Sequence, residues 1–228
     1  MADHLDVPPA LREIVARDLR PVSALPPPAR RIIAVVPIAL ILLVAAVLVF
    51  GLRRDAPRLG LTLTWVASAL QVAVGLLLTM AALREAVPGT TLPRRVAGAM
   101  TGTALIATIA ITTLTWFSSP TRIAPGLVAY VWSVCVAGTV ISALPVLAVA
   151  GWLVARAFPL RPRLAGALYG VGAGLIADAG WRLFCHFSDP VHVFGAHTLG
   201  VALVAVIATV GSGPKAHGSH IELELKQK

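Results

Sequence analysis

The side chains best suited to chemistry gather in one short stretch of this sequence. It contains Cys185, His186, Asp189, His192 and His197. Thiolate, imidazole and carboxylate groups are the usual protein ligands of zinc and related transition metals. The same groups support redox chemistry, because a positively charged neighbour lowers the pKa of a thiol and increases its thiolate fraction. The stretch is therefore a candidate metal or redox site.

Spacing alone does not choose between a sensor and a structural role. The pattern C-H-x-x-D-x-x-H matches no strong zinc motif, and the sequence has no C-x-x-C pair. In a structural role, the histidines would only make hydrogen bonds at a membrane surface. Catalysis is less favoured than either, because an enzyme needs a nucleophile paired with a base or several convergent carboxylates. Asp178 and Asp189 are the only acidic residues nearby.

Three more residues belong to the candidate site. Asp178 and Arg182 are four residues apart, so a helix places them on one face, where they can form an ion pair. A charge within hydrocarbon is costly unless it is paired, so we expect an intramembrane ion pair. Cys135 is the second of two cysteines. It lies near Cys185 at the outer surface if its helix starts late, and is a small apolar residue deep in the membrane if the helix starts early.

Six long apolar blocks must position these residues. They cover residues 32–51, 59–83, 96–117, 126–154, 164–184 and 191–211. A helix rises about 1.5 Å per residue and hydrocarbon is about 30 Å thick, so about 20 apolar residues span a bilayer. Because backbone groups in lipid must be hydrogen-bonded within their own segment, the sequence predicts an all-α, polytopic membrane protein with a bundle of six transmembrane helices. Gly166, Gly170 and Gly174 form a row that permits close helix packing.

Composition and charge agree with a membrane protein. The chain of 228 residues is 57% hydrophobic and 13% charged, with a mean hydropathy of +0.85, which excludes an ordinary soluble domain. Its net charge of +9 does not indicate nucleic-acid binding, because the basic residues cluster at the ends of the apolar blocks. With a cytoplasmic N-terminus, fourteen of the 19 lysine and arginine residues lie on the inner side. The positive-inside rule therefore predicts that both termini are cytoplasmic.

Residues 1–31 form a separate N-terminal segment, followed by the membrane domain 32–211 and a polar cytoplasmic tail, 212–228. A short helix is predicted between Pro8-Pro9 and Pro21, and Leu11, Ile14, Val15 and Leu19 recur on one face of it. A helix of about three turns is marginal in water, so it needs a partner. We expect that partner to be the membrane surface, the bundle or another protein.

Two motifs resemble the NrsF-type membrane anti-sigma factors, a family with the same six-span layout. The first is Asp18-Leu19-Arg20-Pro21-Val22, followed by Leu25-Pro26-Pro27 and by Arg30-Arg31. The second is Cys185 with Ser188-Asp189-Pro190-x-His192 and then His197. The order Cys185-His186 departs from the family, in which His often precedes Cys and Pro directly follows. His186 is therefore the least supported member of the site.

The resemblance implies a regulator without enzymatic activity, located in the bacterial inner membrane. Its N-terminal segment would bind an extracytoplasmic-function sigma factor, and an envelope or oxidative signal at the outer Cys/His cluster would release that factor. The expected contacts with the sigma factor are Leu11, Ile14, Val15, Arg17, Asp18, Leu19 and Arg20. Its partners would be the sigma factor and the lipid bilayer, with no direct nucleic-acid contact. We expect no cofactor, with a metal ion at Cys185 and His192 as the one alternative.

Two other classes of function stay open at this point. A small transporter or channel would use Asp178 and Arg182 as groups along its pathway. An integral-membrane enzyme acting on a lipid or a quinone would use the Cys/His cluster for chemistry. Deletion of residues 1–20 separates the three classes, because only an anti-sigma factor should lose its function through that deletion.

Overall fold

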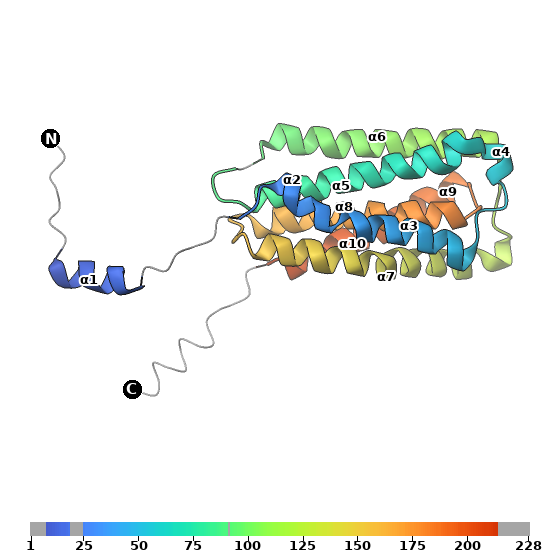
Figure 1. Ribbon diagram of the computed structural model, residues 1–228. Helices are drawn as coiled ribbons and strands as arrows, with labels where there is room; N and C mark the ends of the chain where they lie inside the picture. Colours follow the sequence, from blue (N-terminus) through green and yellow to red (C-terminus); the bar gives the residue numbers. More distant parts are fainter. Residues whose placement is uncertain (1–7, 19–24, 91, 214–228) are drawn as a thin grey trace, which may run out of the picture.

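The computed structural model describes residues 8–18, 25–90 and 92–213, and every regular element in these ranges is helical (Figure 1). The all-α prediction is therefore confirmed for this part of the chain. The short N-terminal helix is α1 (Pro9–Asp18), which follows Pro8. Proline suits a first helical turn, because its missing N–H group would have no partner there.

Each of the six apolar blocks is filled by one helical element or by several in succession, which together form one pass along the bundle. In chain order they are α2 (Pro28–Arg31), η1 (Ile32–Ala34) and α3 (Val36–Phe50); α4 (Ala56–Leu61), η2 (Thr62–Val66) and α5 (Ala67–Glu85); α6 (Arg94–Ser118); η3 (Pro125–Leu127) and α7 (Val128–Ala155); α8 (Pro162–Phe184); and α9 (Pro190–His192), η4 (Val193–His197) and α10 (Thr198–Gly211). The π-helical segments η2 and η4 interrupt the second and the last of these passes.

Consecutive passes run in alternating directions along one bundle (Figure 1). At one end, which we call the N-terminal end, the Arg31 guanidinium donates to the carbonyl oxygens of Leu83 and Leu153. At the opposite end, the Arg53 N–H donates to the Leu183 carbonyl at 2.8 Å. The end of α2 and the ends of α5 and α7 therefore lie together, whereas the α3–α4 connection lies beside the end of α8.

Five passes are long and apolar enough to cross a membrane. They are Pro28–Phe50, Ala56–Glu85, Arg95–Ser118, Pro125–Ala155 and Pro190–Gly211. Within the described residues α8 does not join them, because its glycines and its three charged residues, Arg163, Asp178 and Arg182, lower its hydropathy. It is nevertheless the central helix of the bundle, and it packs against α3, α5, α7 and α10.

Glycines allow neighbouring helices to approach α8 closely. A Cβ atom on Gly170 would lie 2.7 Å from the Ala208 Cβ of α10, and one on Gly172 would lie 2.6 Å from the Gly75 carbonyl oxygen of α5. Because real Cβ atoms do not approach other atoms so closely, only glycine fits at these contacts. The row Gly166, Gly170 and Gly174 therefore packs against α10, whereas Gly172, outside that row, packs against α5.

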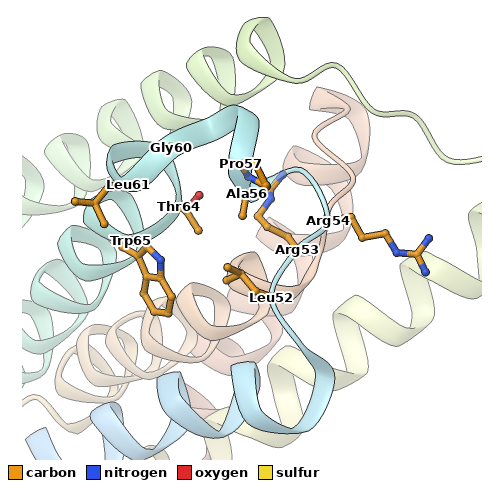
Figure 2. A pocket seen from close by; sticks show the side chains of 9 residues that line it. All are labelled: Leu52, Arg53, Arg54, Ala56, Pro57, Gly60, Leu61, Thr64 and Trp65. Carbon is orange, nitrogen blue, oxygen red and sulfur yellow. The ribbon is translucent and has the colours of Figure 1, made fainter.

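A cavity of about 510 Å³ opens beside the α3–α4 connection (Figure 2). No cysteine or histidine is among the residues that line it. Arg53 pairs with Asp55 at 2.6 Å and also donates to the Arg182 carbonyl at 3.3 Å, whereas Arg54 points away from the cavity. The Arg53 charge is thus paired within this connection.

Candidate functional site

The two cysteines and two of the histidines come together at the end of the bundle opposite α2. Cys135 lies on α7, Cys185 directly follows α8, and His192 and His197 belong to α9 and η4. One ligand atom from each of these residues lies within 4.8 Å of the other three, and all four side chains are buried. We call this group the thiol–imidazole cluster.

The cluster has the dimensions of a tetrahedral metal site. The Cys135 and Cys185 sulfur atoms are 4.0 Å apart, and the His192 Nε2 atom lies 3.7 and 3.5 Å from them. A zinc ion with bonds of about 2.3 Å to sulfur and about 2.0 Å to nitrogen would separate two sulfurs by about 3.8 Å, and sulfur from nitrogen by about 3.5 Å. Cys135, Cys185 and His192 therefore have nearly the spacing of zinc ligands, and the four ligand atoms including that of His197 lie within 4.8 Å of one another.

The same geometry suits reversible oxidation of the two thiols. Both cysteines are free. A disulfide bond has a sulfur–sulfur distance of about 2.05 Å, so the observed 4.0 Å separation must shorten by about half. Bond formation therefore needs α7 and the end of α8 to move toward each other, or a change of side-chain rotamer.

A carboxylate orients one histidine of the cluster. Asp178 Oδ1 lies 2.6 Å from His197 Nδ1, which leaves His197 Nε2 available to the cluster. The second ring nitrogen of a metal-binding histidine usually donates to a carboxylate, a backbone carbonyl or a water, which fixes the ring orientation and raises the basicity of the ligand. By contrast, His192 Nδ1 is buried without a hydrogen-bond partner among the described residues.

The same carboxylate connects the cluster to three other helices. Gln71 Nε2 of α5 donates to Asp178 Oδ2 at 2.6 Å, and Arg182 Nε donates to the same oxygen at 3.1 Å. Arg182 Nη2 also reaches Thr112 Oγ1 of α6 at 3.3 Å. His197 is therefore linked through Asp178 by hydrogen bonds to α5, α6 and α8.

Two residues of the sequence-based set lie outside the cluster. The His186 ring packs on Phe187, with centroids 4.2 Å apart, and its carbonyl accepts a hydrogen bond from the Thr121 hydroxyl. Asp189 caps α9 by accepting from the Val191 N–H at 3.2 Å. These two residues hold the α8–α9 turn in place, and the structure does not bring either into the group of four.

Sequence reasoning missed Gln71 and Thr112. Gln71 is the only amide side chain in the block 59–83, and a lone polar group of that kind within a span points to a buried partner. Thr112 carried no comparable signal, because threonine is common in this part of α6.

The expected sigma-binding residues occupy an unpartnered surface, as far as the structure describes them. Leu11, Ile14 and Val15 of α1 have 50%, 57% and 51% of their surface exposed. Arg17 pairs with Glu13 on the same helix at 3.5 Å. Leu19, Arg20 and the side chain of Asp18 lie outside the described residues.

Arg31, at the boundary between the N-terminal segment and the first long helix, is buried although it is charged. Its guanidinium donates to the Leu83 carbonyl at 3.4 Å and to the Leu153 carbonyl. Both carbonyls belong to the last turns of helices, where the helix dipole favours a positive charge. Arg31 therefore fixes the end of the N-terminal segment to α5 and α7.

Comparison with known families identifies one match, which covers most of the chain. The family described as negative regulator of sigma F, NrsF, matches residues 15–214. Neither a curated protein nor a solved structure gives a significant match. The matched range includes the thiol–imidazole cluster and, on the apolar face of α1, Val15 but not Leu11 or Ile14. This chain therefore belongs to the NrsF family of negative regulators of sigma factor.

Proposed function

We propose that this protein is an anti-sigma factor of the bacterial inner membrane that sequesters an extracytoplasmic-function sigma factor on its cytoplasmic side. The observation that carries the proposal is membership of a family of sigma-factor regulators, in a chain whose N-terminal helix has an exposed apolar face. Leu11, Ile14 and Val15 supply the apolar contacts. Arg17, Asp18 and Arg20 contribute to selectivity and to the association rate.

In this proposal the chain crosses the membrane six times, with both termini in the cytoplasm. The distribution of lysine and arginine residues supports that orientation. The sixth crossing is α8, which is less apolar than the other five passes. A helix surrounded by other helices can carry glycines and a paired Asp178–Arg182, since little of its surface meets lipid.

The signal acts on the thiol–imidazole cluster, which then faces the outer side. Two chemistries fit its geometry. A zinc-like ion would be held by Cys135, Cys185, His192 and His197. Alternatively, hydrogen peroxide would oxidise the two thiols to a disulfide, taking two electrons and two protons and becoming two molecules of water. In this proposal, either event changes the contact between Cys135 of α7 and Cys185 at the end of α8, and a shift of α7 follows.

Transmission to the cytoplasmic side follows α7 and α5. Cys135 lies near the start of α7, and the Leu153 carbonyl near its end accepts a hydrogen bond from Arg31. Gln71 of α5 contacts Asp178, and the Leu83 carbonyl of the same helix also accepts from Arg31. Movement of either helix therefore changes the support of the N-terminal segment.

Sigma binding is tested with a pair of charge-matched variants. Ile14→Asp places a carboxylate on the exposed apolar face of α1, whereas Ala16→Asp places one on the opposite face. We expect Ile14→Asp to lose the co-purifying sigma factor and to release target transcription without a signal. Ala16→Asp should retain both properties. Sigma binding that survives Ile14→Asp and a deletion of residues 9–18, with normal membrane levels, contradicts the proposal.

The sensor chemistry is tested by zinc content and by thiol labelling of the purified protein. His192→Ala removes a cluster residue, whereas His186→Ala removes a histidine that packs on Phe187 outside the cluster. We expect bound zinc, or peroxide-induced loss of the free thiols, to fall strongly in His192→Ala and to stay at the parent level in His186→Ala. Equal behaviour of the two variants excludes a sensor built on the cluster.

A further inference from the structure

A large apolar groove lies at the N-terminal end of the bundle, far from the thiol–imidazole cluster. Its volume is about 750 Å³. The walls include Leu77, Met80 and Arg84 of α5, and Met100 of α6. The segment Leu25–Ala29, which leads into the first long helix, forms part of its rim. Methionine side chains are flexible and suit a surface that accommodates another helix.

A short connection holds α1 near this groove. Six residues, 19–24, join the end of α1 to Leu25 at the groove rim. Because an extended chain spans at most about 3.5 Å per residue, Asp18 always stays within about 25 Å of Leu25. A short tether of this kind gives an effective concentration in the millimolar range, which exceeds that of a separate partner.

The chemistry of α1 matches the groove. Leu11, Ile14 and Val15 form one exposed apolar face, and in the described part of the chain no other element covers it. Burying such a face removes apolar surface from water and stabilises a helix that is marginal alone. The groove is mainly apolar, with Arg84 as a charged residue among those that line it.

We propose that α1 docks into this groove when no sigma factor is bound. Sigma factor and groove then compete for the same three side chains, Leu11, Ile14 and Val15. This inference rests on the proposed function, because competition requires that α1 is the sigma-binding helix. Docking gives the sigma-free regulator a defined closed state.

Helix α5 connects this groove to the sensor end. Gln71 contacts Asp178, whereas Leu77, Met80 and Arg84 line the groove further along the same helix. At about 1.5 Å per residue, Arg84 lies about 20 Å from Gln71 along the axis. A small axial shift or rotation of α5 therefore changes the groove walls, and with them the balance between docked and sigma-bound α1.

Cysteine cross-linking of the full chain in membrane vesicles tests the docking. The pair Ile14→Cys and Met80→Cys joins the apolar face of α1 to the groove, and the pair Ala16→Cys and Met80→Cys is the matched control. Without sigma factor, we expect a 14–80 cross-link by mass spectrometry and none for 16–80. Added sigma factor should abolish the 14–80 cross-link.

The other outcomes contradict either the docking, the competition or the proposed function, and they are distinguishable. If sigma factor co-purifies but position 14 does not cross-link in its absence, docking is wrong while the proposed function stands. A 14–80 cross-link that persists with bound sigma factor excludes competition. A cross-link only between two chains assigns the groove to a second copy, and co-purified lipid that blocks labelling of Met80→Cys assigns it to acyl chains. Failure of sigma binding in the parent protein contradicts the proposed function itself.

Discussion

Helices α6 and α8 have similar lengths but opposite surroundings. Most of α8 is buried, and glycines bring α5 and α10 against it. By contrast, α6 is largely exposed, with Leu105, Ile106 and Phe117 facing outward. The apolar side chains of α6 thus face outward, as expected of a helix that meets lipid, whereas the paired Asp178 and Arg182 of α8 lie inside the bundle.

The largest effect expected from this comparison concerns the carboxylate at the centre of α8. Asp178→Asn leaves Arg182 without its charged partner and weakens the orientation of His197. Breaking a buried ion pair from one side costs about 3–5 kcal/mol, so we expect a strongly reduced melting temperature in detergent. The matched change Asp189→Asn should have little effect, because asparagine caps a helix as well as aspartate does. Equal melting temperatures of the two variants would show that the contacts of Asp178 do not stabilise the bundle.

An intermediate effect is expected where helices touch through glycine. Gly172→Ala puts a methyl group against the Gly75 carbonyl oxygen and the Thr79 hydroxyl. Overpacking of this kind costs about 1–3 kcal/mol. Gly102→Ala on α6 is the control, since no heavy atom of the described chain lies within 4 Å of the added Cβ. Thermal unfolding should show a loss for Gly172→Ala and no loss for Gly102→Ala, and the reverse order would contradict the central place of α8.

The smallest effect is expected at the hydrogen bond between Arg182 of α8 and Thr112 of α6. Thr112→Val removes the hydroxyl that accepts from Arg182 Nη2. The net contribution of such a hydrogen bond is about 0.5–1.5 kcal/mol. Thr113→Val is the neighbouring control, because the Thr113 hydroxyl bonds only to the carbonyl of Ile109 within α6. If unfolding by detergent titration does not distinguish the two variants, α6 is held by apolar contacts alone.

Periodicity and hydropathy predict the helices of this chain well, because they are local properties of the sequence. All six apolar blocks contain long helices, and the glycine row of the fifth block is a packing surface. Hydropathy cannot predict that α8 is central, since burial depends on neighbours supplied by distant segments. Its comparatively low hydropathy is a consequence of that burial.

The candidate site was predicted only in part, for a similar reason. Spacing in the chain placed His186 and Asp189 beside Cys185, but the turn after α8 uses them for packing and capping. Cys135 joins the cluster although it lies 50 residues from Cys185. Contacts such as Gln71 with Asp178 depend on which face of α5 meets α8, which one sequence without a bundle geometry does not specify.

The contacts of Arg31 also determine when, during synthesis, the N-terminal segment can reach its final position. Its two carbonyl partners are synthesised 52 and 122 residues later, so the ribosome completes three further passes before the second partner exists. A nascent chain that ends before α7 holds its N-terminal helix without that anchorage. The N-terminal segment is therefore synthesised first, but its position is fixed only after α7 has been made.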